Sequence, residues 1–141
     1  MTFLMSKAAP AKILVVDDDV STRTLLELIL SSGGHEVTLL NDGREALAYL
    51  KTNTPELIVI DVNMPVLDGI EVCSRIKKLP RFKKIPVIVL TSMNDAETRT
   101  RATEANASEI VYKPLTGKNF LQTIQGFLQA PPVETDGLNK W

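Results

Sequence analysis

The sequence predicts a doubly wound α/β domain, in which helices cover both faces of a parallel β-sheet. Five apolar runs recur at similar spacing, and three of them are unbroken and rich in β-branched residues. Such runs are typical of strands that are buried on both faces of a sheet. Stretches with helical period separate the runs, and this alternation predicts five parallel strands with five helices around them. The predicted strands are Ile13–Val16, Val37–Leu40, Leu57–Ile60, Val87–Leu90 and Ile110–Tyr112.

Apolar residues spaced three and four apart predict the helices between these strands. The helix expected at 95–105 has mainly alanines on its apolar face, so we expect it to dock weakly. Asp42, Asp68 and Asn94 each lie three residues before a Glu, a pattern that marks a capped helix start. Asp19 is also expected at a helix start, where acids are favoured. The other helices are predicted around 25–29, 46–50, 70–77 and 120–128.

Composition narrows the class of protein. The chain has 141 residues, a net charge of −1 and 44% hydrophobic residues, so no global field favours nucleic acid or an anionic membrane. No apolar run approaches the roughly 20 residues that span a bilayer, and we expect a cytoplasmic protein. The periodic domain is predicted at 11–129, with a flexible segment at 1–10 and a flexible tail or linker at 130–141.

Two residue types and one basic stretch have ordinary interpretations. A single cysteine, Cys73, and a single histidine, His35, exclude an internal disulfide and make a His/Cys zinc site unfavourable. Cys73 is expected to pack as a small apolar residue. Six lysines and arginines lie between Arg75 and Lys84, and we interpret them as a solvated helix end rather than as a nucleic-acid surface.

Polar side chains gather directly after four of the five predicted strands. These positions are Asp17-Asp18-Asp19, Asp61, Thr91-Ser92 and Lys113-Pro114. Ligands of open α/β sheets bind at the carboxyl ends of the strands, so we expect these residues to meet. Clustered carboxylates stay ionised only near a cation, and an all-oxygen ligand set favours Mg²⁺.

The remaining groups suit phosphoryl transfer. A metal ion, the Lys113 ammonium and the Thr91 hydroxyl around Asp61 are able to hold the oxygens of a phosphoryl group. A carboxylate is a competent nucleophile that forms an acyl phosphate. The pattern therefore indicates that Asp61 is the attacking group.

Together these motifs resemble those of two-component response-regulator receiver domains, the CheY-like family. The resemblance rests on Val15-Val16-Asp17-Asp18, Asp61-Val-Asn-Met64-Pro65 with Asp68-Gly69, Leu90-Thr91-Ser92 and Lys113-Pro114, and it covers about residues 11–129. It implies a flavodoxin-like sheet with strand order 2-1-3-4-5. It also implies that Asp61 accepts a phosphoryl group from a histidine kinase or a phosphotransfer protein.

The resemblance assigns a role to each remaining site residue. Mg²⁺ would be held by Asp61, by Asp18 directly, by Asp17 mostly through water, and by the backbone carbonyl of Asn63. Thr91 and Lys113 would each contact a phosphoryl oxygen. Pro114 would follow a cis peptide bond that directs Lys113 into the site.

Several positions depart from the family pattern or vary within it. Ile110 stands where the family often has an aromatic residue that reports phosphorylation, and Tyr112 should face the same side of that strand. Asn106 replaces a common glycine, and Asn tolerates a left-handed turn. Asn63 and Met93 occupy the two positions that tune the lifetime of the phosphoaspartate. Because Ile110 is not aromatic, we expect phosphorylation to be coupled to the output surface mainly through the Thr91 loop and the fourth helix.

The predicted function is a signalling phosphoacceptor, which is not a metabolic enzyme. It would catalyse only its own phosphorylation and dephosphorylation and signal to a downstream protein through the face made by the fourth helix, fifth strand and fifth helix. A phosphatase of the haloacid-dehalogenase type is excluded because Asn63 stands in place of its second aspartate. A degenerate receiver that binds a partner without phosphorylation stays open because of Ile110. The output target, homodimerisation on activation, and whether the chain is stand-alone or part of a longer protein also stay open, and no direct nucleic-acid binding is expected.

Overall fold

The computed structural model describes residues 10–128 and confirms the predicted fold class. Five parallel strands form one sheet in the order β2-β1-β3-β4-β5. The predictions for the segments before residue 10 and after residue 128 lie outside the described residues. The strands are β1 (Lys12–Val16), β2 (Glu36–Leu40), β3 (Leu57–Asp61), β4 (Val87–Thr91) and β5 (Glu109–Tyr112). The helices are α1 (Val20–Ser32), α2 (Gly43–Tyr49), α3 (Gly69–Lys77), the 3₁₀ helix η2 (Pro80–Phe82), α4 (Ala96–Glu104) and α5 (Gly117–Leu128).

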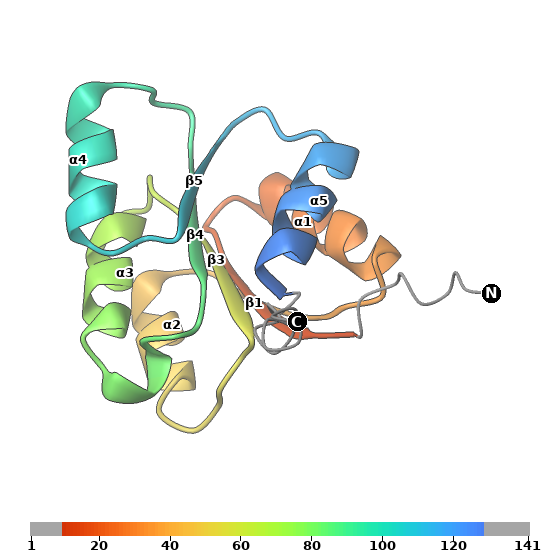
Figure 1. Cartoon of the computed structure of the whole chain (residues 1–141), viewed down its shortest axis with the longest axis horizontal. Coiled ribbons are helices and arrows are strands. Elements are labelled where there is room, and N and C mark those ends of the chain that lie inside the picture. The colour runs from red at the N-terminus through yellow and green to blue at the C-terminus, as the bar shows by residue number, and fades with distance from the viewer. Residues whose placement is uncertain (1–9, 129–141) are drawn as a thin grey trace, which may run out of the picture.

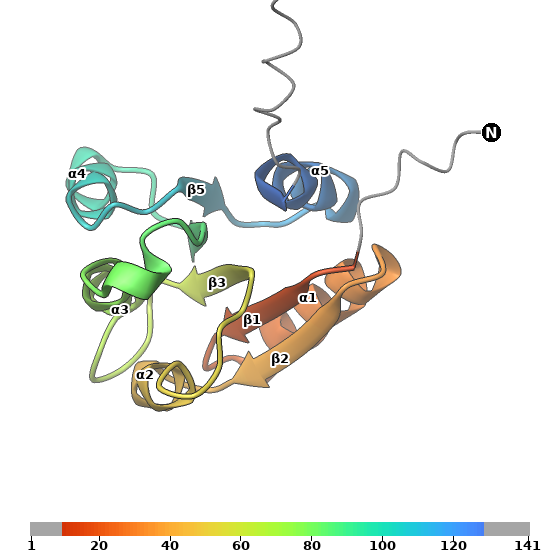
Figure 2. The same cartoon turned by 60° about the horizontal axis from the view of Figure 1, so that its bottom comes forward.

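The sheet lies between two layers of helices (Figures 1 and 2). Helices α1 and α5 cover one face, and α2, α3 and α4 cover the other. Successive strand residues point to opposite faces, so Leu14 and Val16 join the α2–α3–α4 core while Ile13 and Val15 join the α1–α5 core. This two-sided burial explains why the central strands are continuously apolar.

Aspartate side chains begin four helices, three of them as the sequence predicts. Asp19, Asp42 and Asp68 accept backbone N–H bonds at the starts of α1, α2 and α3. The prediction of Asn94 as the cap of the fourth helix is wrong by one residue, because Asp95 accepts the Thr98 N–H at 2.8 Å. Aspartate and asparagine are about equally good caps, so the helix begins one residue later than the motif predicts.

Helix α4 has little apolar anchorage, as its composition predicts. Its buried residues are Thr98 and Ala102, with Ala105 packed just beyond its end. Such a small buried surface supplies little free energy to hold the helix against the sheet. Among residues 10–128 no helix is long and apolar enough to cross a bilayer.

Two further predictions are confirmed locally. Asn106 adopts a φ of 64°, the left-handed conformation that the family's glycine would adopt. Cys73 is fully buried and its thiol lies 3.5 Å from the Ala105 carbonyl oxygen. Burial raises the pKa of the Cys73 thiol to about 11, so the side chain packs as an unreactive apolar group.

Candidate functional site

Three aspartates meet at the carboxyl edge of the sheet. Asp17 and Asp18 follow β1, Asp61 ends β3, and these strands are neighbours in the sheet. One carboxylate oxygen from each residue lies within 4.8 Å of the others. Asp17 and Asp61 are buried and Asp18 is exposed, so the cluster opens to solvent on one side.

Lys113, which follows β5, joins the cluster at the same carboxyl edge of the sheet. Its Nζ donates a hydrogen bond to Asp61 Oδ1 at 2.6 Å. The Lys113–Pro114 peptide bond is cis, as the family resemblance implies. The Lys113 ammonium group reaches Asp61 although β4 lies between β3 and β5 in the sheet.

Thr91 lies at the end of β4 between these elements. It is fully buried, and its Oγ1 accepts the backbone N–H of Met93 at 2.9 Å. This bond ties the hydroxyl to the loop that leads into α4.

Burial disfavours the charged forms of the Asp17 and Asp61 carboxyl groups. Burial, together with the charges of Asp61 and Asp18, raises the pKa of Asp17 to about 6. Burial also raises the pKa of Asp61, although the hydrogen bond and charge of Lys113 act in the opposite direction. For Lys113 burial opposes the charge, but the bond to Asp61 outweighs it and raises the pKa of the ammonium group.

One atom of the cluster has unmet bonding capacity. Asp17 Oδ1 accepts the Asp19 backbone N–H at 2.9 Å, whereas Asp17 Oδ2 is buried with no hydrogen-bond partner among the described residues. A buried carboxylate oxygen without a partner is costly. The residues present fit a divalent cation, because an ion with oxygen ligands would satisfy this atom and offset the repulsion among the acids.

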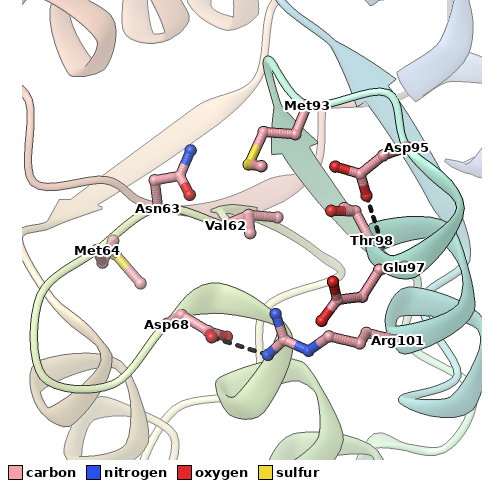
Figure 3. Close-up of a pocket in the computed structure, with 9 residues that line it drawn as sticks. All are labelled: Val62, Asn63, Met64, Asp68, Met93, Asp95, Glu97, Thr98 and Arg101. Atoms are coloured by element: carbon pink, nitrogen blue, oxygen red, sulfur yellow. Dashed lines mark hydrogen bonds and ion pairs between the residues drawn. The ribbon is translucent and has the colours of Figure 1, made fainter.

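A pocket with both polar and apolar lining residues begins directly after Asp61, at Val62 and Asn63. It has a volume of about 450 Å³, and Asn63, Met93 and Asp95 lie along it with the start of α4 (Figure 3). Asn63 and Met93 approach it from opposite sides, one from the loop after β3 and the other from the loop after β4. The two predicted tuning residues therefore lie on the same opening.

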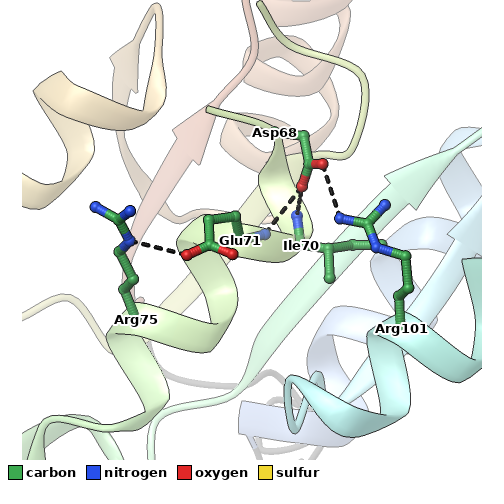
Figure 4. Close-up of polar contacts among 5 residues, drawn as sticks. All are labelled: Asp68, Ile70, Glu71, Arg75 and Arg101. Carbon is green, nitrogen blue, oxygen red and sulfur yellow. Dashed lines mark hydrogen bonds and ion pairs between the residues drawn. The ribbon is translucent and has the colours of Figure 1, made fainter. Parts of the chain in front are cut away.

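An ion pair that the sequence did not predict crosses this pocket. Arg101 Nη2 donates to Asp68 Oδ2 at 2.8 Å and so joins α4 to the start of α3 (Figure 4). Asp68 Oδ1 meanwhile accepts the backbone N–H groups of Ile70 and Glu71, both at 2.9 Å. Burial raises the pKa of Asp68, but these donors outweigh it and the net shift is downward. The capping motif predicted the role of Asp68 at the start of α3. No local pattern in the sequence identified Arg101 as its partner.

The predicted switch residues of β5 lie on one side of the strand. Ile110 and Tyr112 both line a pocket of about 300 Å³ beside Ala102 and Thr103 of α4. Ile110 is half-buried against the α2–α3–α4 core, and the ring of Tyr112 is exposed.

Comparison with known proteins agrees with this geometry. The family described as "Response regulator receiver domain" matches residues 13–125. A probable transcriptional regulator, ycf27, from Cyanophora paradoxa is 40% identical over 91% of this chain, and a 14.6 kDa protein from Leptolyngbya boryana is 36% identical over 92%. The chain spans 99% of the Leptolyngbya protein but only 54% of the Cyanophora regulator.

Solved structures show the same fold. The chemotaxis protein CheY4 of Vibrio cholerae is 34% identical with a TM-score of 0.81, and the match covers 85% of this chain and all of that one. The receiver domain of the sensor histidine kinase PA1611 from Pseudomonas aeruginosa, solved with a magnesium ion in its active-site cleft, is 27% identical with a TM-score of 0.80. That match covers 86% of this chain and 100% of that domain. The chain therefore belongs to the family of response regulator receiver domains.

Proposed function

We propose that this domain accepts a phosphoryl group on Asp61 from a histidine kinase or phosphotransfer protein and passes the signal to a protein target. The observation that carries the proposal is the Asp61 carboxylate, buried and held at 2.6 Å by Lys113 beside Asp17, Asp18 and Thr91. A structural ion pair would not need two further acids at the same point. This role is consistent with two expectations from the sequence, a cytoplasmic location and no direct binding of nucleic acid.

The proposed metal site consists of Asp17, Asp18, Asp61 and the backbone carbonyl of Asn63. Mg²⁺ bound there would neutralise negative charge that develops on the phosphoryl oxygens. The magnesium-containing receiver of PA1611 supports this assignment, as does the unpartnered Oδ2 of Asp17.

The chain's own groups account for the rest of the reaction. An oxygen of Asp61 attacks phosphorus, a new acyl P–O bond forms, and the bond from phosphorus to the donor's nitrogen or oxygen breaks. The Lys113 ammonium, already oriented on Asp61, moves its hydrogen bond to a phosphoryl oxygen. The Thr91 hydroxyl takes another oxygen, and Asn63 and Met93 at the opening govern the access of hydrolytic water.

Signalling would follow from the movement of Thr91. Because Thr91 Oγ1 holds the Met93 N–H, its reorientation displaces the loop before the weakly anchored α4. Tyr112 and Ile110 border the pocket beside α4 and are placed to respond. The α4–β5–α5 face is then the output surface, whether its partner is a target protein or a second copy.

Intact-mass measurement tests the proposal. Incubation with Mg²⁺ and acetyl phosphate should add one alkali-labile phosphoryl mass, and omission of Mg²⁺ should prevent the gain. If no donor produces the gain, the alternative of a phosphorylation-independent interaction module replaces this one.

Magnesium affinity should depend on pH through Asp17. Because its pKa is raised to about 6, the carboxyl is largely protonated below that pH and must lose the proton to bind metal. Calorimetric titration should show affinity rising by about tenfold in total as the pH increases from about 5 to about 7.5, and levelling off above the pKa, as expected for one released proton. Asp17→Asn should flatten this dependence, and an unchanged affinity across the range in the wild-type protein would contradict the assignment.

The Asp68–Arg101 ion pair should hold α4 in place. Arg101→Gln is expected to cost less than about 1 kcal/mol of global stability, because the pair is partly exposed. Hydrogen exchange of the α4 amides should nevertheless accelerate, since α4 buries little else. Arg75→Gln is the matched control, because it breaks the Glu71–Arg75 pair within α3 and should leave α4 unchanged (Figure 4). If the α4 amides exchanged at the same rate in both variants, the Asp68–Arg101 pair would not hold α4 in place.

A further inference from the structure

An apolar groove lies at the opposite edge of the sheet from the phosphorylation site. It has a volume of about 660 Å³ and lies where α2, α3 and η2 come together. Both helices follow strands of a parallel sheet and return toward its amino-terminal edge, so their C-terminal ends lie away from Asp61 (Figure 1). We call this surface the α2–α3 groove. Its apolar lining consists of Leu47, Leu50, Leu79, Pro80 and Phe82.

The walls of the groove are fixed in place. Lys77 Nζ donates to three backbone carbonyls, those of Phe82 at 3.2 Å, Lys83 at 2.9 Å and Ile85 at 2.6 Å. Arg81 donates to the Leu50 carbonyl and lies 4.6 Å from the centre of the Phe82 ring. The segment after α3 is thereby joined to the end of α2, and the groove is held by contacts within the protein. A preformed groove loses less free energy to ordering when it binds.

The apolar surface is open to a partner. Leu79 is 44% exposed although it lies within this apolar lining. Isolated exposed leucines are ordinary, but an exposed leucine that belongs to a shaped apolar groove is typical of an interaction site.

The charge around the groove is of one sign. Lys51, Arg75 and Arg81 lie along its edge, and residues 72–94 contain six lysines and arginines with no aspartate or glutamate. Glu71, just before this stretch, is paired with Arg75 at 3.0 Å. This local excess contrasts with the net charge of −1 for the whole chain. It therefore selects an anionic partner through complementary charge.

We propose that the α2–α3 groove binds a segment of a partner protein in which apolar side chains are flanked by aspartate and glutamate. The apolar residues would fill the groove and the acids would face its basic edge. Nucleic acid fits less well, because the Phe82 ring is only 1% exposed and Arg81 already covers it, so no ring face is free for a base. The proposal does not depend on phosphorylation of Asp61.

A designed peptide is a direct probe. A short fluorescein-labelled peptide of alternating leucine and glutamate should bind the full chain with a Kd of roughly 10–500 μM in low salt. Replacement of its glutamates by glutamine, or of its leucines by serine, should each weaken binding about tenfold. Equal binding of all three peptides would overturn the proposal.

Matched protein variants locate the site. Leu79→Ser and Lys51→Glu should each weaken peptide binding about tenfold, whereas Leu28→Ser should not, although Leu28 on α1 is 65% exposed. An equal loss in all three would overturn the assignment to this groove. So would sedimentation showing self-association that Leu79→Ser abolishes, because the occupant would then be a second copy. Stronger binding of duplex DNA than of the peptide would overturn it in favour of nucleic acid.

Discussion

Asp61→Asn is expected to abolish the Mg²⁺-dependent gain of a phosphoryl mass, to on the order of one per cent of the wild-type yield or less. The amide is nearly the same size but is a poor nucleophile and a weaker metal ligand. Intact-mass analysis in Mg²⁺ and acetyl phosphate measures the effect, and circular dichroism verifies that the variant is folded. Asp61 is 2% exposed, so the fold check is essential to the interpretation.

Asp19→Asn is the matched control for that variant. It makes the same chemical change close in sequence, at the exposed residue whose carboxylate caps α1. Asparagine is also a good cap, so stability should change little and phosphorylation should persist. If Asp19→Asn lost phosphorylation while Asp61→Asn kept it, the site would be assigned to the wrong carboxylate.

Gly69→Ala is expected to produce the largest loss of stability, about 2–3 kcal/mol, seen as a fall in Tm of roughly 6–12 °C. A Cβ at this position would lie 2.1 Å from the Asp61 carbonyl oxygen and 2.7 Å from Ile60 Cγ2. Backbone cannot swing aside as a flexible side chain does, so the start of α3 must move away from β3. Because the clash is with Asp61 itself, slower phosphorylation should accompany the loss of stability.

Gly126→Ala provides the contrasting result. No atom lies within 4 Å of a Cβ built at Gly126, and the residue is exposed in α5. Alanine there should stabilise the protein by about 0.5–1 kcal/mol through its higher helix propensity. A similar destabilisation by both variants would show that the Gly69 contact is not the cause.

The sheet and the core of the site could be predicted because their signals are local. Unbroken apolar runs identified the strands, and the polar residues directly after them met at one edge because parallel strands end together. Lys113 was assigned to the site by the same reasoning, because it directly follows the last strand. The cis bond to Pro114 was predicted from the family resemblance. The caps of α1, α2 and α3 were evident in the residues themselves.

Features that depend on packing between distant segments could not be predicted from the sequence. Arg101 on a polar helix resembles any surface arginine, and only the docking of α4 beside α3 brings it to Asp68. Lys77 was interpreted as a solvated residue, yet it holds three carbonyls of the following loop. The cap of α4 lay at Asp95 rather than Asn94, because adjacent capping residues are nearly equivalent until the backbone selects one.

We expect the phosphoryl group to be carried by Asp61 rather than by Asp17 or Asp18. Borohydride reduces an acyl phosphate to the alcohol, so treatment of the phosphorylated protein followed by peptide mass spectrometry identifies the modified residue. We expect homoserine at position 61 and unmodified aspartate at positions 17 and 18, with no conversion when Mg²⁺ is omitted. Homoserine at position 17 or 18, or conversion independent of Mg²⁺, would contradict it.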